Sequence, residues 1–120
     1  MKQMTGKQSI SFAEPVYIEG SAAVVGEMEK EGPLGAYFSH TLSDAMCGQE
    51  SWEEGESELQ LAAAKLAMQR ADVKPEQIRM VFAGDLLAQS IASSFGLVNL
   101  NCPLYGLFGA CSTIGEAISL

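Results

Sequence analysis

One long amphipathic segment, residues 51–72, constrains the fold of this chain more than any other feature of its sequence. Ser51 and Glu54 have the spacing of a capping box, which marks the start of a helix. Acidic residues crowd the first turns and basic residues lie toward the other end, the order that the helix dipole favours. We expect a scaffold helix that ends near Asp72. Its apolar face consists of residues at three- and four-residue spacing: Leu59, Ala62, Ala63, Leu66 and Ala67.

Strands and helices alternate after this segment. Two short apolar runs, 79–83 and 103–108, lack strict alternation of polar and apolar residues, which is typical of strands buried on both faces of a parallel sheet. Each run is followed by a predicted helix, at 86–97 and at 114–120. This order predicts an α/β fold with right-handed crossovers.

The residues before the long helix give weaker signals. Residues 8–12 are a candidate strand, and residues 16–26 are a second extended stretch because β-branched and aromatic residues dominate it. Residues 26–51 contain breakers, solvated charges and several large apolar side chains. We expect this segment to pack back on the body as short helical turns, and a long irregular segment in a compact domain is often functional.

The charge balance excludes several classes of function. The 120 residues include 15 Asp and Glu against seven Lys and Arg, a formal net charge of −8. Such a chain lacks the basic surface of non-specific nucleic-acid binding and of electrostatic docking to an anionic membrane. No apolar run approaches the roughly 20 residues of a membrane span, and the N-terminal residues lack the apolar region of a secretory signal. The length fits one domain.

Three cysteines, Cys47, Cys102 and Cys111, are too few and too scattered for a disulfide framework. With His40 as the single histidine, a zinc site is not expected, nor is any other metal or cofactor. We expect an intracellular, reducing compartment. Cys47 and Cys102 are interpreted as small buried apolar residues, and His40 as an exposed or packing side chain.

The turn at Cys111 is different because it joins a predicted strand to a predicted helix. A cysteine in the first turn of a helix feels the positive end of the helix dipole, which stabilises its thiolate. The small residues Gly109 and Ala110 allow a sharp turn and the close approach of a ligand, and free N–H groups at the helix start can hold an anion. The same pattern fits a close-packed turn with an inert buried thiol, and the sequence leaves both interpretations open.

Gly84 and Asp85 end the preceding strand, so they belong to the same edge of the predicted sheet. Asp85 is a candidate N-cap for the helix predicted at 86–97. It is also a candidate ligand or metal contact, because open α/β sheets bind ligands at the carboxyl ends of their strands. One residue can do both.

The segment Phe108-Gly109-Ala110-Cys111-Ser112 resembles the nucleophile turn of the thiolase and β-ketoacyl synthase superfamily, and residues 66–78 are similar to its helix, connector and next strand. Further segments narrow the resemblance to the stage V sporulation protein AD family, a thiolase-like family of spore-forming bacteria. These segments are residues 31–35, 46–53, 83–89 and 107–116. The similarity extends over essentially all 120 residues.

The resemblance implies a thiolase-like fold, in which two similar α/β halves form a layered sandwich. Residues 1–120 would be a truncated, N-terminal part of the first half. The resemblance also implies a role in the uptake of dipicolinic acid, chelated with calcium, into the developing spore. It further implies a homodimer that lies peripherally at the inner membrane of the spore, with membrane proteins of the same uptake system as partners.

The expected function is therefore the binding of dipicolinate in a pocket near Cys111. The alternative is a thiolase-type acyltransferase with Cys111 as nucleophile. Catalysis is the weaker expectation, because the resemblance assigns the partners of this cysteine to the second half of the fold, and His40 matches none of them. A third interpretation is a structural subunit with a vestigial site. The candidate ligand-binding residues are Cys111, Ser112, Ala110, Gly84 and Asp85.

Overall fold

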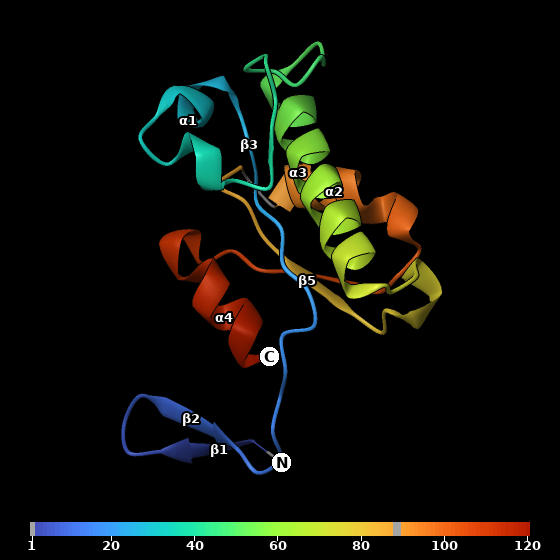
Figure 1. Cartoon of the computed structure of the whole chain (residues 1–120). Coiled ribbons are helices and arrows are strands. Elements are labelled where there is room, and N and C mark those ends of the chain that lie inside the picture. The colour runs from blue at the N-terminus through green and yellow to red at the C-terminus, as the bar shows by residue number, and fades with distance from the viewer. Residues whose placement is uncertain (1, 88–89) are drawn as a thin grey trace.

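The α/β class is confirmed by the computed structural model, which describes residues 2–87 and 90–120 (Figure 1). The helices are α1 (Glu27–Glu31), α2 (Trp52–Ala71), α3 (Ile91–Leu97) and α4 (Thr113–Ser119). The strands are β1 (Lys2–Thr5), β2 (Ser9–Phe12), β3 (Val24–Val25), β4 (His40–Thr41), β5 (Val81–Ala83) and β6 (Leu104–Gly106). Short 3-10 turns lie at Gly35–Tyr37, Pro75–Gln77, Val98–Leu100 and Ala110–Ser112.

The helix α2 is the scaffold on which other elements pack, as its sequence predicts. It begins after Ser51, whose side chain accepts a hydrogen bond from the Glu54 backbone N–H (3.3 Å) and donates one to the Glu54 carboxylate (3.1 Å). It ends where Asp72 adopts a left-handed conformation with φ +54°. The helix predicted at 51–72 is therefore confirmed, together with its N-cap at Ser51 and its end near Asp72.

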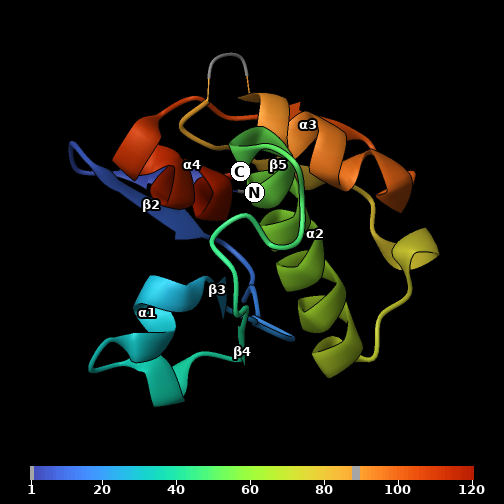
Figure 2. The ribbon, with the colours of Figure 1, turned by 90° about the horizontal axis from the view of Figure 1, so that it is seen from above.

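The core lies where α3 packs against α2 (Figure 2). Among the described residues, the buried apolar side chains are Ala92, Leu97 and Leu100. The two helices approach so closely that a Cβ at Gly96 would lie 2.5 Å from the Ser57 carbonyl oxygen. Only glycine fits at this position. The Ser57 hydroxyl lies within hydrogen-bond distance of the Ala92 carbonyl oxygen across the contact (3.0 Å) and of the Glu53 carbonyl oxygen one turn earlier in α2 (2.9 Å).

The strands β5 and β6 form a parallel pair in which Phe82 is opposite Tyr105, with ring centroids 5.4 Å apart. This pairing confirms the strands predicted at 79–83 and 103–108, although both are shorter than expected. The expectation that both faces would be buried is wrong, since Tyr105 keeps 51% of its surface exposed. Each sheet of the described chain has two strands, so one edge of each strand has no strand partner.

The N-terminal residues form two further strand pairs. The antiparallel hairpin of β1 and β2 includes the strand predicted at 8–12. The parallel pair of β3 and β4 includes Val24 and Val25, but the rest of the strand predicted at 16–26 has no strand partner in the described chain. The side chain of Arg70 holds this region to α2 by donating to the Ser21 carbonyl oxygen (2.8 Å) and the Ser39 hydroxyl (2.7 Å). The short helical turns expected in residues 26–51 are present.

The helix predicted at 86–97 begins later than expected, at Ile91. The Asp85 carboxylate accepts a hydrogen bond from the Leu87 backbone N–H (2.9 Å), which makes an Asx turn in place of a first helical turn. Its other oxygen accepts from the backbone N–H (2.8 Å) and the hydroxyl (2.6 Å) of Ser93, in the first turn of α3. Residues 88–89 of the predicted helix lie outside the described residues.

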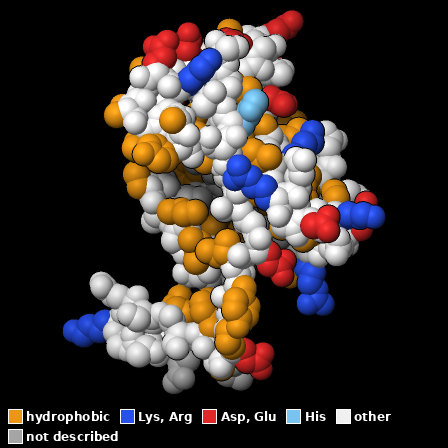
Figure 3. Space-filling model, viewed as in Figure 1, with side chains coloured by type: hydrophobic (Ala, Val, Ile, Leu, Met, Phe, Trp, Pro, Cys, Tyr) orange, Lys and Arg blue, Asp and Glu red, His pale blue; other side chains and the backbone are white. Residues whose placement is uncertain are grey.

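The last helix, predicted at 114–120, is confirmed as α4, which packs against β5. Its apolar side chains are largely exposed, with Ile114 at 68% and Ile118 at 69%. Figure 3 shows hydrophobic side chains gathered over this part of the molecule and over the junction with the hairpin. In the part of the chain that the structure describes, no helix has the length and hydropathy to cross a bilayer.

Candidate functional site

The carboxyl ends of β5 and β6 meet at one edge of their sheet, as their parallel pairing requires. The Leu107 backbone N–H donates to the Ala83 carbonyl oxygen (2.8 Å), so the two chain segments stay paired past the strands. Gly84 then contacts the segment that follows β6: a Cβ there would overlap the Leu107 carbonyl oxygen and lie 2.8 Å from the Thr113 methyl carbon. The structure thus brings Gly84 beside the turn that contains Cys111.

The turn itself is sharp and locally strained. Ala110 adopts φ +49°, a left-handed conformation that costs a non-glycine residue on the order of 1 kcal/mol. Cys111 follows in the 3-10 turn, and α4 begins only at Thr113. Cys111 therefore lies in the 3-10 turn that leads directly into α4, and the helix itself begins one residue earlier than predicted.

Side-chain hydrogen bonds hold this turn in place. The Gly109 backbone N–H donates to the Thr113 hydroxyl (3.2 Å). The Ser112 hydroxyl lies within hydrogen-bond distance of the Gly109 carbonyl oxygen (2.8 Å) and the Glu116 carboxylate (2.7 Å). Sequence reasoning assigned no role to Thr113 or Glu116. The sequence pattern that could have indicated a role is their spacing, Thr-x-x-Glu at a helix start, which is the spacing of a capping box.

Cys111 is exposed and lies between two hollows of the surface. The larger hollow, about 910 Å³, extends from α2 across β5, and Gly84, Ala110 and Cys111 are among the residues that line it. The smaller one, about 640 Å³, lies along α4 and is lined by Cys111, Ser112 and Glu116 among others. Four of the five candidate residues therefore line hollows that share the Cys111 thiol, and this thiol is not the inert buried one of the alternative interpretation.

Asp85, the fifth candidate, lines neither hollow. It is buried, with 7% of its surface exposed, and its carboxylate accepts the three hydrogen bonds from Leu87 and Ser93. A buried carboxylate with these partners stabilises the start of α3. The geometry favours the capping interpretation, while the ligand-binding role of Asp85 stays a prediction.

The other two cysteines have different surroundings. The Cys102 thiol is half-buried and donates to the Leu100 carbonyl oxygen (3.1 Å). Cys47 is also half-buried; burial raises the pKa of its thiol, and the negative charges of Asp44 and Glu58 act in the same direction. Both keep more contact with solvent than the predicted buried position implies.

His40 is exposed on β4, which confirms its interpretation as an exposed or packing side chain. The described residues contain no group of three or more His, Cys, Asp or Glu side chains arranged to hold a metal ion. The turn at Cys111 is thus built from a thiol, hydroxyls, one carboxylate and small apolar side chains, and it suits ligand contact through backbone groups and sulfur.

Comparison of the sequence with known proteins identifies the family of this chain. A sequence model described as stage V sporulation protein AD matches residues 6–120, which include the whole turn at Cys111. The curated relative named stage V sporulation protein AD, from Bacillus subtilis (strain 168), is 35% identical over 118 residues, or 98% of this chain. The chain belongs to the stage V sporulation protein AD family. It spans about a third (35%) of the length of that relative.

Membership in the stage V sporulation protein AD family confirms the resemblance read from the sequence and makes this chain a sporulation protein. The matched residues contain both halves of the candidate site, the end of β5 at Gly84 and the turn at Cys111. Small strand pairs flanked by helices are consistent with the thiolase-like α/β unit expected for the family.

Proposed function

We propose that this chain contributes to dipicolinic acid uptake into the developing spore by binding dipicolinate beside Cys111. The observation that carries the proposal is the family match over residues 6–120, which includes the exposed turn. The two hollows that meet at Cys111 offer a planar ligand a surface on either side of the thiol. Gly84, Ala110 and Ser112 complete the proposed contact set.

Charge decides the form in which the ligand would bind. Dipicolinate is a dianion, whereas Glu56 lines the larger hollow and Glu116 the smaller one. Neither lining includes a lysine or arginine among the described residues. A dianion in these surroundings needs a counter-charge. We therefore assign the site to the calcium chelate, in which the calcium ion that dipicolinate carries supplies the counter-charge.

The setting that we propose is the inner membrane of the developing spore, where the protein acts peripherally as a homodimer with membrane proteins of the same uptake system. The apolar side chains of α4 are exposed, and this exposure favours additional polypeptide that packs over them. The relative is almost three times as long as the part that matches. Residues that correspond to the rest of its length would supply this cover and the second thiolase-like half.

Titration calorimetry with dipicolinate, with and without calcium, tests the proposal. We expect saturable heat in the presence of calcium, and weaker binding by Cys111→Ala. The matched control is Cys102→Ala, because Cys102 lines neither hollow and should leave binding unchanged. Absence of saturable heat under both conditions contradicts the proposal, and normal binding by Cys111→Ala removes the thiol from the site.

The exposure of Cys111 also supports a second candidate function, acyl transfer. In that reaction the Cys111 thiolate attacks the carbonyl carbon of an acyl-CoA, a new S–acyl bond forms, and the CoA thiolate leaves. Incubation with acetyl-CoA followed by intact-mass measurement tests it. One added acetyl group, absent from Cys111→Ala, supports the enzyme; an unchanged mass contradicts it.

A further inference from the structure

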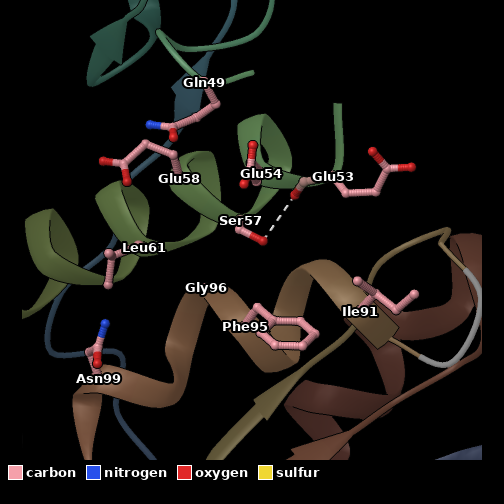
Figure 4. A pocket seen from close by; sticks show the side chains of 10 residues that line it. All are labelled: Gln49, Glu53, Glu54, Ser57, Glu58, Leu61, Ile91, Phe95, Gly96 and Asn99. Carbon is pink, nitrogen blue, oxygen red and sulfur yellow. Dashed lines mark hydrogen bonds between the residues drawn. The ribbon is translucent and has the colours of Figure 1, made fainter. Parts of the chain in front are cut away.

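A further hollow, separate from the two at Cys111, lies between α2 and α3 (Figure 4). None of its lining residues belongs to the turn at Cys111. Its volume is about 480 Å³. Leu61 from α2 and Ile91 and Phe95 from α3 give it an apolar floor, and Phe95 is 72% exposed there. We call it the α2–α3 groove.

The α2–α3 groove is preformed by the packing of its two walls. The Ser57 hydroxyl lies within hydrogen-bond distance of the Ala92 carbonyl oxygen on α3 (3.0 Å) and of the Glu53 carbonyl oxygen on its own helix (2.9 Å), and Gly96 lies against the Ser57 backbone. The close approach at Gly96 fixes the spacing of the two helices, and Phe95 stays exposed beside it. An exposed aromatic side chain in a rigid groove is a typical anchor point of a protein interface.

The rim of the α2–α3 groove is acidic. Glu53, Glu54 and Glu58 extend from the first turns of α2, as Figure 4 shows. The other polar side chains of the described lining are neutral, and it includes no lysine or arginine. The groove therefore matches an occupant with an apolar face and a positive charge.

The hairpin of β1 and β2 has these properties. Its register puts Met4 opposite Ile10 with Phe12 on the same face, while Thr5 and Ser9 lie on the other face. Residues 2–13 contain two lysines and no acidic residue. The apolar side chains of Met4 (61%), Ile10 (38%) and Phe12 (42%) remain exposed.

The hairpin has little support from its own chain. Each of its strands packs mainly against the other, and Figure 1 shows it standing off the body, at the end opposite the start of α2. An isolated two-stranded hairpin is marginally stable in water, so its apolar face needs a surface. Its own groove lies at the far end of the molecule, but the groove of another copy is accessible.

We propose that the β1–β2 hairpin of one copy docks into the α2–α3 groove of a second copy, and that the exchange is reciprocal. Lys7, at the hairpin turn, would lie against the glutamate rim, while Phe12 and Ile10 cover Phe95 of the groove. Reciprocal docking closes a two-fold dimer and leaves no open end for a filament. With a net charge of −8, two copies repel over most of their surface, so this basic–acidic pair is where attraction concentrates.

Sedimentation velocity across a concentration series of the 120-residue chain tests the proposal. We expect a dimer that Lys7→Glu and Glu58→Lys each weaken roughly tenfold, because each substitution removes two ion pairs per dimer. The double variant Lys7→Glu with Glu58→Lys reverses both charges and should restore the wild-type dissociation constant to within about threefold. Lys30→Glu and Glu76→Lys, both at exposed positions outside the hairpin and the groove, are the matched controls and should change nothing.

The apolar part of the contact is tested by Phe95→Ser, which leaves the hairpin sequence intact and changes an exposed side chain. We expect it to weaken the dimer by about thirtyfold or more, with an unchanged circular dichroism spectrum. A chain that stays monomeric at every concentration overturns the proposal. So does a dimer that ignores both charge reversals, or one that the double variant fails to restore.

Discussion

The region where α2 meets α3 and the region around Cys111 use opposite means to hold their shape. In the first, Ala92 and Leu97 are buried and Gly96 brings two helices into backbone contact. In the second, hydrogen bonds among Gly109, Ser112 and Glu116 hold a strained turn. The difference shows that a packed helix pair supports an accessible turn that is held by polar contacts.

A glycine-to-alanine pair tests this comparison with the largest expected effect. Gly96→Ala would push a Cβ into the Ser57 carbonyl oxygen, so we expect the free energy of unfolding to fall by about 3 kcal/mol. Gly115→Ala on α4 is the matched control, because a Cβ there meets nothing within 4 Å and alanine favours the helix by about 1 kcal/mol. Urea denaturation measures both, and equal losses would show that the two regions are packed alike.

Two carboxylates allow a second comparison. Asp85→Ala leaves buried N–H and hydroxyl groups of Ser93 without their acceptor, and we expect a loss of about 2 kcal/mol. Glu116→Ala removes an exposed carboxylate that accepts one hydrogen bond, so the loss should stay below about 1 kcal/mol. Thermal denaturation distinguishes them. A larger loss for Glu116→Ala would mean that the turn at Cys111, and not α3, limits stability.

The thiols should differ in their rate of alkylation. Cys111 is exposed, whereas burial raises the pKa of the Cys47 thiol, and Asp44 and Glu58 raise it further. At neutral pH, Cys47 therefore has less reactive thiolate, and iodoacetamide should modify Cys111 first. Peptide mass spectrometry after timed quenching gives the order. Earlier modification of Cys47 would contradict the exposure that the site requires.

The smallest expected effect concerns the loop before α2. The backbone N–H groups of Gly48 and Met46 hold the pKa of Asp44 below its ordinary value. The lowered pKa means that this carboxylate favours the folded loop above the pKa of the unfolded chain, and that the contribution is lost as the pH falls through the folded pKa. Carboxyl NMR of the titration should show a midpoint below that of an unstructured aspartate. A midpoint equal to that of an unstructured aspartate would contradict the hydrogen bonds from the Gly48 and Met46 backbone to Asp44.

Local signals made part of this fold predictable. The capping box at Ser51 and the helical periodicity located α2, and the two apolar runs located β5 and β6 as a parallel pair. The start of α3 was wrong, because a propensity argument does not show that the Asp85 side chain captures the Leu87 N–H. Burial of both sheet faces was also wrong, since burial depends on which elements cover a strand.

The candidate site was predictable to a similar degree. Parallel pairing of β5 and β6 was enough to expect Gly84 beside the turn at Cys111, and the structure brings them together. The bonds from Ser112 to Glu116 and from Gly109 to Thr113 were not anticipated, because they depend on the left-handed conformation of Ala110. The strand β1 was missed as well, since its four residues carry no strong strand pattern.

Amide chemical-shift mapping with calcium and dipicolinate tests the central claim most directly, because it reports on both regions in one titration. The account predicts saturable shifts at Gly84, Ala110, Cys111 and Ser112, with the amides of Ser57 and Gly96 unchanged. Shifts confined to the α2–α3 region, or none at all at saturating ligand, would contradict the assignment of the ligand site to the turn at Cys111.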